Sequence, residues 1–565
     1  MFDPYPNYAS ADYLLTFPPV KECYLDAANV TRLPDIFIYP GLPQHQTAAP
    51  LGSYQELGLR DDICFERFGR LGPYGYGYEK DKGGSGAGLK VESKGSELIW
   101  QQMNGQIDWL LVDWNDAQNR CYARNKARFE VEQPSTESSG RRLISRTAIV
   151  LRTWGDFYYD PHILSTIRAI ITELALKSGG EYTVHFLVDI KEITAPIWAS
   201  EEVYQETLRR LVPEEFRGMA TLWSEKQMEM IYPGPFEDNL ENMSGSGIYG
   251  VYRSGHMALQ YFASQHPEYD FFWNWEMDIR YTGHYYELFE RLKEWAKRQP
   301  RKALWERSAR FYIPAFHGPW DEFSQRVERE VEGDNEEPIW GPVRFPELAS
   351  LGPEEDTRPP FSSAEDQDSA SATWGVGEEA DLITLNPLFD PNNTHWIFRN
   401  DVTGYNRSYP VPPRRAAIIT AARLSRRLLM LMHEETFRLR HTMFPEMWSP
   451  TVALHHGLKA VFAPHPVYMD RKWPLDVLAA TFNGGKSGSS GGKGSSLFGP
   501  AEHNFGGTTW YSNAGFSGAL WRRWLGMSEN GEGGVQAESK GTGRMCLRSV
   551  LVHPVKHEQG PLDPP

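Results

Sequence analysis

The chain has 565 residues and a net charge of −16 at pH 7, and 40% of its residues are hydrophobic. The length exceeds one ordinary domain, and the apolar fraction is sufficient for a large core. The acidic balance, without any long basic run, argues against a nucleic-acid-binding protein, because nucleic acid is normally bound by a basic patch. A small phosphorylated ligand stays compatible with this charge if a bound metal supplies the positive charge.

Residues 1–145 are rich in Pro, Gly and Tyr and show few clear elements, which predicts an irregular N-terminal extension packed on the main domain. The main domain begins at residue 146 with TAIVLRTW (147–154), a short apolar strand. A helix follows, with Asp160 as its N-cap and Pro161 as its first residue.

Strands and helices alternate over the next 130 or so residues. We expect strands at 181–190 and 219–223, helices at 201–211 and 248–266, and a fourth strand in FFWNWEMDIRY (271–281). This order is typical of a parallel α/β sheet, in which right-handed crossovers place helices on both faces.

The fourth strand runs directly into Glu276 and Asp278. Side chains of a strand alternate between faces, so these two carboxylates should point the same way, at the carboxyl end where open α/β sheets bind ligands. Two carboxylates there are a candidate site for a hard divalent cation. The alternative is a strand end capped by two solvated acids.

The rest of the main domain, which we expect to end at residue 525, contains interruptions. Residues 326–380 are predicted to be an acidic surface insertion, and 483–497 a flexible Gly/Ser loop. A long helix is expected over 414–440. Residues 526–565 are interpreted as a flexible tail.

The four cysteines have no spacing typical of zinc, and Cys64–Cys121 is one possible disulfide that the sequence does not decide. Four N-x-S/T sequons are compatible with a secretory location. No apolar run reaches the roughly 18 residues that span a bilayer, and the first residues do not resemble a signal peptide. Membrane association would therefore need an anchor outside this chain, and a cytoplasmic location stays open.

Four segments resemble a fungal family of proteins of unknown function that share one domain, over roughly residues 60–525. They are CFERFGRLGPYGYGY (64–78), LRTW (151–154), EMDIRYTGH (276–284) and HHGLKAVFAPHPVY (455–468). From residue 146 on, the order of elements also resembles glycosyltransferases of the GT-A fold, with an acid-x-acid strand end and a later helix that begins with an acid. This resemblance implies a Rossmann-like, mostly parallel sheet. It also implies transfer of a sugar, of hexosyltransferase type, from a nucleotide-sugar donor to a glycan or glycoconjugate, in the Golgi or elsewhere in the secretory pathway.

The resemblance implies Mn²⁺ or Mg²⁺ bound to the donor diphosphate. Asp278 is then the first-choice ligand and Glu276 the second, although Glu276 could instead bind donor hydroxyls, since GT-A relatives carry Asp there. A distal histidine ligand is expected, for which His503 and His465 are the candidates. The simpler interpretation of either histidine is a hydrogen bond to a loop carbonyl.

Substrate residues follow from the same comparison. Glu446 matches the helix-start acid that serves as base in inverting relatives, although the helix macrodipole also explains an acid there. Expected contacts to the nucleotide sugar are Arg152, Thr153, Asp189 and Arg253, and expected contacts to the acceptor are Trp448, His455 and His456.

Two other functions fit parts of the sequence. One is a non-catalytic GT-A-like module that binds glycan or protein. The other is a glycoside hydrolase with paired carboxylates, against which the parallel α/β order argues.

Overall fold

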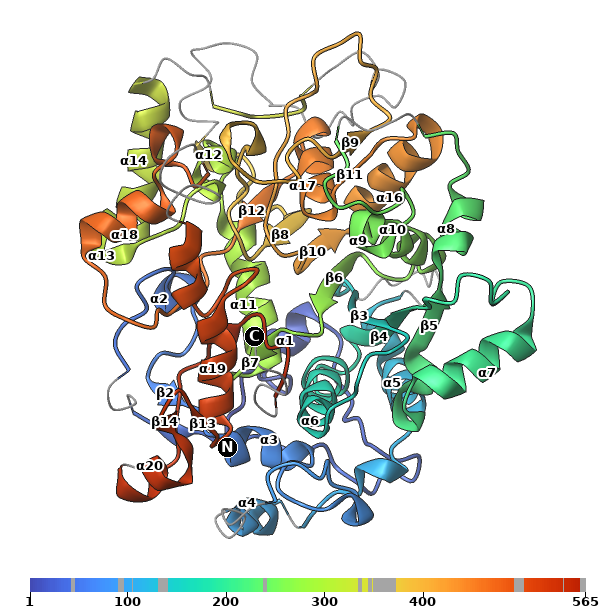
Figure 1. The fold of residues 1–565 in the computed structure, drawn as a ribbon. Helices are drawn as coiled ribbons and strands as arrows, with labels where there is room; N and C mark the ends of the chain where they lie inside the picture. The colour runs from blue at the N-terminus through green and yellow to red at the C-terminus, as the bar shows by residue number, and fades with distance from the viewer. Residues whose placement is uncertain are drawn as a thin grey trace.

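A seven-stranded sheet forms the centre of the structure, which is a computed structural model (Figure 1). It describes residues 1–41, 46–89, 96–103, 105–130, 141–236, 241–333, 338–343, 348, 372–491, 502–541 and 543–558. The strand order is β12-β8-β10-β6-β3-β4-β5. The strands are β3 (Thr147–Trp154), β4 (Tyr182–Asp189), β5 (Ala220–Trp223), β6 (Phe271–Glu276), β8 (Leu382–Thr384), β10 (Ala422–Ser425) and β12 (Ala460–Phe462).

The sheet is mostly parallel. Strands β3, β4, β5 and β6 pair in parallel, and so do β8 and β12. Only β10 among these strands is antiparallel to its neighbours β6 and β8. The predicted α/β class, with the first four strands in the expected places, is confirmed.

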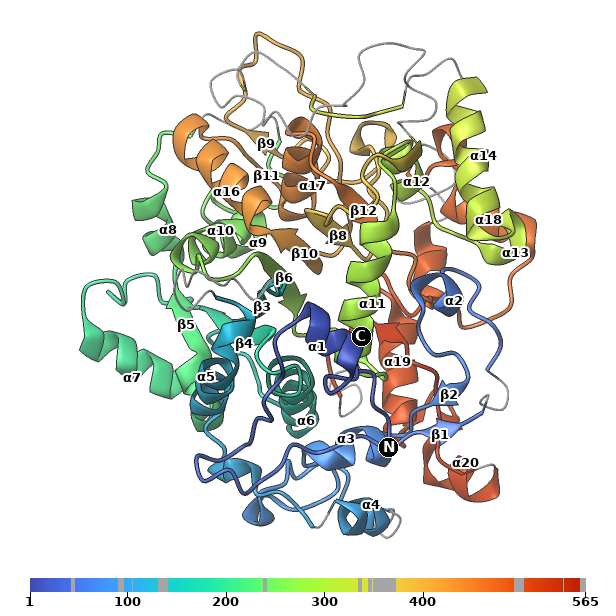
Figure 2. The same ribbon diagram turned by 180° about the vertical axis from the view of Figure 1, so that it is seen from behind.

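Helices cover both faces of the sheet (Figures 1 and 2). One layer contains α5 (Trp114–Asn125), α6 (Pro161–Ile170) and α11 (Tyr285–Arg298), and the other α10 (His256–Gln265), α16 (Arg426–Glu434) and α17 (Pro445–His455). Strand β6 packs on both layers: Trp273 stacks on Phe289 of α11 with ring centroids 4.5 Å apart, and Phe272 contacts Phe262 of α10. This two-sided burial explains why four of the six residues of the strand are aromatic.

Shorter elements complete the fold. The helices are α1 (Ala11–Thr16), α2 (Tyr54–Leu57), α3 (Arg67–Leu71), α4 (Glu97–Gln102), α7 (Glu201–Leu211), α8 (Glu225–Ile231), α9 (Val251–Ser254), α12 (Leu304–Ser308), α13 (Pro314–His317), α14 (Trp320–Gly333), α18 (Leu475–Phe482), α19 (Gly515–Trp524) and α20 (Gly534–Lys540). The strand pairs are β1 (Tyr39–Pro40) with β2 (Ile63–Cys64), β9 (Val402–Thr403) with β11 (Thr442–Met443), β13 (Ser528–Glu529) with β14 (Glu532–Gly533), and β7 (Arg280–Tyr281) with β15 (Leu551–Val552). No helix among the described residues is both long and apolar enough to cross a membrane.

The helix predicted over 414–440 is wrong in its first half. Residues 422–425 form β10, and the helix begins only at Arg426. Arg423 does not lie on a solvated face, because its guanidinium packs over the ring of Phe271 at 4.1 Å and pairs with Glu379. Pairing with β6 and β8 in the middle of the sheet therefore outweighs the local helical pattern.

The N-terminal region packs on the main domain, as predicted. Gln118 of α5 accepts the N–H of Val184 and donates to its carbonyl, at 2.7 and 3.2 Å. These two hydrogen bonds satisfy the backbone N–H and C=O of Val184, which lies on β4 before the part that pairs with β5. Arg70 forms a fully buried ion pair with Glu173, at 2.7 Å, after α6.

The interpretation of residues 526–565 as a flexible tail is wrong for the part that is described. Residues up to 558 contain α20 and β15, and β15 pairs with β7, directly after the two acids. The disulfides are Cys23–Cys121 and Cys64–Cys546, so the Cys64–Cys121 pairing is also wrong. Strand β2 lies beside the C-terminal segment through the Phe65–Leu547 bridge, which places Cys64 next to Cys546.

Two predicted interruptions lie partly outside the described residues. Of the expected insertion at 326–380, α14 extends to Gly333, and residues 334–337, 344–347 and 349–371 are not described. Of the expected Gly/Ser loop at 483–497, residues 492–497 are not described.

Candidate functional site

Three potential metal ligands meet at the carboxyl end of β6. Glu276 is the last residue of this strand, and its register partner on β3 is Arg152. Asp278 follows two residues later, and His553 arrives from the chain directly after β15. One ligand atom of each of the three side chains lies within 4.8 Å of the other two. The two acids predicted from the sequence are therefore together, and a histidine that the sequence analysis missed joins them.

His553 is held with one ring nitrogen facing the acids. Its backbone N–H donates to the carbonyl of Thr509 at 2.9 Å, and Nδ1 lies 2.9 Å from the carbonyl oxygen of Tyr511. A carbonyl only accepts, so Nδ1 carries a proton. Nε2 then lies 3.4 Å from Glu276 Oε2 and 3.3 Å from Asp278 Oδ1, so the buried imidazole pairs with both acids. A carbonyl bond that fixes the tautomer is how metal-binding histidines are usually oriented.

The electrostatics of the three side chains are tightly linked. Burial raises the pKa of Glu276 and of Asp278, but His553 outweighs burial and holds both below their usual range. Burial lowers the pKa of His553, and the two carboxylates raise it, with a net value of about 9. In the absence of a metal, the imidazole thus supplies the positive charge between the acids. Two carboxylates and one imidazole are a donor set that fits Mn²⁺ or Mg²⁺.

Two further cations flank the acids. Arg152 Nη2 lies 3.6 Å from Glu276 Oε1 and donates to Thr420 Oγ1 at 2.7 Å. Lys556 Nζ pairs with Asp278 Oδ2, and its side chain is 65% exposed. Because the Lys556 side chain is exposed, its ammonium can also reach an anionic ligand bound beside Asp278.

A strained loop connects these acids to Glu446. The N–H of Thr420 donates to Glu276 Oε1 at 2.9 Å, and the N–H of Ile419 donates to Glu446 Oε1 at 2.7 Å. Ile419 has a φ of +70°, which is rare for a β-branched residue and costs roughly 1–3 kcal/mol. The loop thus holds two carboxylates from different elements in one arrangement.

Glu446 is a half-buried acid at the start of α17, as predicted. Burial raises the pKa of Glu446, the N–H of Ile419 lowers it, Glu276 raises it and His553 lowers it, with a net value of about 8. A carboxylate with a pKa near neutrality is a good proton acceptor.

Of the four residues expected to bind the nucleotide sugar, Arg152 and Asp189 stay candidates, Thr153 is buried and Arg253 is corrected. Arg152 lies at the acids, and Asp189 lies at the end of β4, where burial raises its pKa to about 7 and Oδ1 has no hydrogen-bond partner among the described residues. Thr153 is buried in β3. Arg253 must be corrected, because it forms a buried ion pair with Asp401 at 2.6 Å and does not reach the acids.

The predicted acceptor contacts are also corrected. Trp448, His455 and His456 are all buried in the core. His455 Nε2 donates to the carbonyl of Pro413, and His456 pairs with buried Glu435 at 2.7 Å. These contacts leave no face of the three side chains open to a sugar.

Among the described side chains the third ligand is His553, and the predicted His465 does not take this place. His465 is buried and donates from Nε2 to the carbonyl of Leu385 at 3.0 Å. His503 falls in a short 3-10 turn (Glu502–Gly507), and its side chain lies outside the described residues. The segment LVHPV (551–555) could have indicated His553, because a histidine interrupts an apolar strand-like run there. It was overlooked because residues 526–565 were interpreted as a flexible tail.

A second acidic cluster lies nearby but already contains a cation. Asp160, His162 and Glu558 have ligand atoms close together. Arg280 pairs with Glu558 and donates to the carbonyls of Met277 and Ile279, at 2.6 and 2.9 Å. A metal ion there would face the guanidinium, so this cluster positions the Asp278 turn instead.

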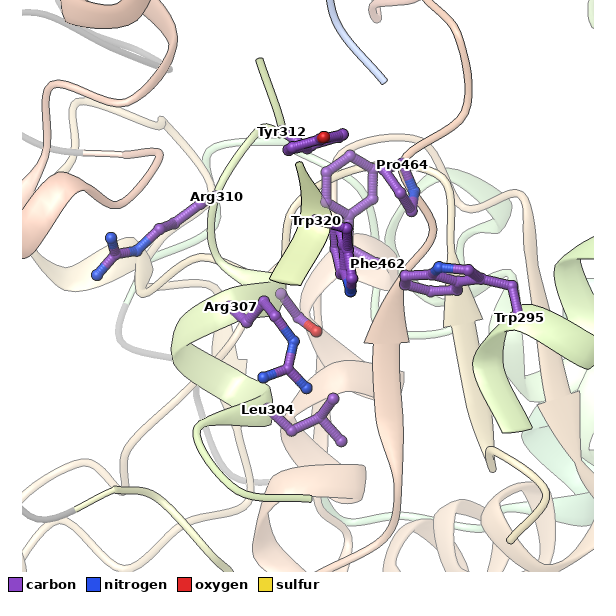
Figure 3. A pocket seen from close by; sticks show the side chains of 9 residues that line it. Trp295, Leu304, Arg307, Arg310, Tyr312, Trp320, Phe462 and Pro464 are labelled. Carbon is purple, nitrogen blue, oxygen red and sulfur yellow. The ribbon is translucent and has the colours of Figure 1, made fainter. Parts of the chain in front are cut away.

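A crevice at the far end of the sheet does not qualify as a ligand site. Its lining includes Trp295, Trp320, Tyr312 and Phe462 (Figure 3). The space between these side chains is too narrow to admit a water molecule, so it belongs to the aromatic packing.

The Cys64–Cys546 disulfide anchors the segment that supplies His553, which follows Cys546 by seven residues (546 to 553). Replacing both cysteines by serine is expected to lower the free energy of unfolding by about 2–4 kcal/mol and to weaken Mn²⁺ binding. The matched control removes Cys23–Cys121, which should cost similar stability and leave Mn²⁺ affinity unchanged. Thermal unfolding and Mn²⁺ titration measure the two effects, and equal affinity losses in both variants would contradict this role.

Residues 64–557 match the family described as "Protein of unknown function (DUF3405)", and the chain belongs to this family. Searches of the curated proteins and of the solved structures found no match.

Proposed function

We propose that the protein is a metal-dependent glycosyltransferase of GT-A type, which moves a sugar from a nucleotide-sugar donor to a glycan or glycoconjugate. The observation that carries this proposal is the convergence of Glu276, Asp278 and His553, in which the buried Nε2 lies 3.4 and 3.3 Å from one oxygen of each acid. Two carboxylates this close together need a cation, which the imidazolium supplies in the metal-free protein and which a bound metal would supply in its place. The site lies at the carboxyl end of a parallel strand, where such sheets bind ligands.

Glu276, Asp278 and His553 would hold Mn²⁺ or Mg²⁺, which when bound neutralises the charge that develops on the departing diphosphate. Arg152 and Lys556 flank the acids and would face the phosphate oxygens. Asp189, with its buried free oxygen, would accept a hydrogen bond from the nucleoside.

Glu446 would remove the proton from the attacking acceptor hydroxyl. Its pKa of about 8 makes it a stronger base than an ordinary carboxylate, and its hydrogen bond to the N–H of Ile419 fixes its orientation. The proposal includes the secretory pathway as the compartment, because two disulfides are typical of oxidising environments.

The direct test is thermal unfolding with UDP or GDP, with and without Mn²⁺. Nucleotide plus Mn²⁺ should stabilise the protein by about 2.7 kcal/mol at a concentration of 100 Kd. Asp278→Asn should remove the Mn²⁺-dependent part, since an amide is a poor substitute for a carboxylate ligand. Asp116→Asn, a change at an exposed acid on α5, is the matched control and should leave the Mn²⁺-dependent part unchanged.

A screen of sugar nucleotides for Mn²⁺-dependent hydrolysis then identifies the donor. No stabilisation by either nucleotide, together with no hydrolysis of any sugar nucleotide, would refute the proposal. Retained glycan binding in that case would favour the non-catalytic module.

A further inference from the structure

Tyr252 is an exposed aromatic ring on top of buried ones. It lies on α9, and its side chain is 57% exposed. Its ring meets Phe398 and Phe444 edge-on, with centroids 6.0 and 5.7 Å apart. Below it, Phe398 and Phe444 stack at 3.8 Å, and Trp396 packs against both. We call the buried rings Trp396, Phe398 and Phe444 the aromatic base.

The aromatic base connects Tyr252 to Glu446. Phe444 is the N-cap of α17, two residues before Glu446, and α9 packs against this helix (Figures 1 and 2). The two side chains are close enough to interact electrostatically: burial raises the pKa of the Tyr252 hydroxyl, and the Glu446 carboxylate raises it further.

The short helix that carries Tyr252 is fixed on its inner side. Arg253 pairs with Asp401 at 2.6 Å and donates to Thr403 Oγ1 at 2.7 Å, and all three side chains are buried. Directly after α9, a Cβ at Gly255 would meet the Val251 carbonyl oxygen at 2.7 Å and Arg152 Nη1 at 3.2 Å, so glycine allows the end of α9 to lie close to Arg152. Tyr252, the neighbour of Arg253, is therefore an exposed ring on a rigid helix. Because this helix is already ordered, less conformational entropy is lost when a ligand binds to the ring.

We propose that Tyr252 binds the acceptor by stacking its ring on the apolar face of a pyranose. The inference rests on the proposed function, in which Glu446 must lie within hydrogen-bond reach of the acceptor hydroxyl. The acceptor ring must then lie beside Glu446, and the exposed aromatic surface of Tyr252 lies there too. A tyrosine offers a large apolar area together with a polar tip, which suits a ligand with both kinds of surface. This residue takes the role that Trp448, His455 and His456 cannot fill from the core.

Saturation-transfer NMR tests the inference with methyl α-mannoside, methyl β-glucoside and methyl β-galactoside, in the presence of UDP and diamagnetic Mg²⁺. The wild type should transfer saturation to the ring C–H protons of at least one glycoside. Tyr252→Ala should bind that glycoside about two- to tenfold more weakly, and Tyr252→Phe should bind it like the wild type, since the ring is kept. Tyr39→Ala, which removes a 51% exposed tyrosine on the distant strand β1, is the matched control and should change nothing.

The thermal shift with UDP and Mg²⁺ is measured on the same variants and should be unchanged in Tyr252→Ala. Equal glycoside binding by Tyr252→Ala and the wild type, or no transfer to any of the three glycosides while the nucleotide shift persists, would overturn the inference and leave the proposed function standing. If the wild type shows no thermal shift with UDP or with GDP and hydrolyses no sugar nucleotide, the proposed function is refuted, and the inference with it.

Discussion

His553→Gln is expected to weaken Mn²⁺ binding by about 100-fold or more, because it removes one of the three ligand atoms that the fold brings together. Even residues that only orient a metal ligand cost 10–100-fold in affinity when replaced, so losing the ligand itself should cost at least the upper end of that range. Electron paramagnetic resonance of free Mn²⁺ measures the affinity without any knowledge of the substrate. The segment should still fold, since β15 and the Cys64–Cys546 disulfide hold it independently.

The pH dependence of this binding has a defined sign. The pKa of His553 is raised to about 9, so at pH 7 the metal must displace a proton from its ring. The apparent affinity should rise about tenfold per pH unit between pH 6.5 and 8, and His553→Gln should lose most of this slope. The metal-free protein shows the opposite trend: a raised pKa in the fold contributes stability that is complete below pH 6.5 and is lost as the pH approaches 9.

His465→Gln is the matched control for this prediction. Both imidazoles pack against Trp510, with centroids 5.1 and 5.4 Å away, but His465 bonds to the carbonyl of Leu385 and does not face the acids. Its replacement should alter stability and leave Mn²⁺ affinity unchanged. Wild-type affinity in His553→Gln would show that the three side chains form an ion-paired cluster and no metal site.

The elements that were predicted correctly carry their information locally. Strands β3 to β6 are apolar runs between clear helix signals, and the caps of α6 are readable at Asp160 and Pro161. Glu276 and Asp278 were also predicted correctly, because their spacing and their place at a strand end can both be read from the local sequence. Strand β10 was missed because only its partners in the sheet, β6 and β8, distinguish it from the helix that follows.

The missing parts of the site depend on contacts between distant residues. His553 lies 275 positions after Asp278 (278 to 553), and its ring is aimed by carbonyls that no sequence pattern marks. Arg253 was placed near the correct strand, but its side-chain direction is set by Asp401, a charge in a distant loop. Sequence periodicity predicts which face a residue occupies and does not predict which partner it finds there.

Glu446→Gln is expected to lower the transfer rate by about 10²–10⁴-fold, the usual contribution of a positioned general base. Glutamine keeps the size of the side chain and can still accept the N–H of Ile419, so the nucleotide-induced thermal shift should not change. The wild-type rate should rise with pH up to about 8, where Glu446 loses its proton, and the variant should lack this rise. Glu434→Gln, an exposed change on α16, is the control.

Stability provides a readout of Glu446 that needs no substrate. A carboxyl group whose pKa is raised from 4.5 to about 8 contributes stability that is fully present below pH 4.5 and is lost as the pH rises through 8. Glutamine resembles the neutral acid at every pH, so Glu446→Gln should unfold at a higher temperature than the wild type at pH 9 and at a similar one at pH 4.5. If this stability change appears while transfer proceeds at the wild-type rate, the raised pKa of Glu446 is confirmed but Glu446 is not the base. The proton would then leave the acceptor by another route, as in enzymes that retain configuration.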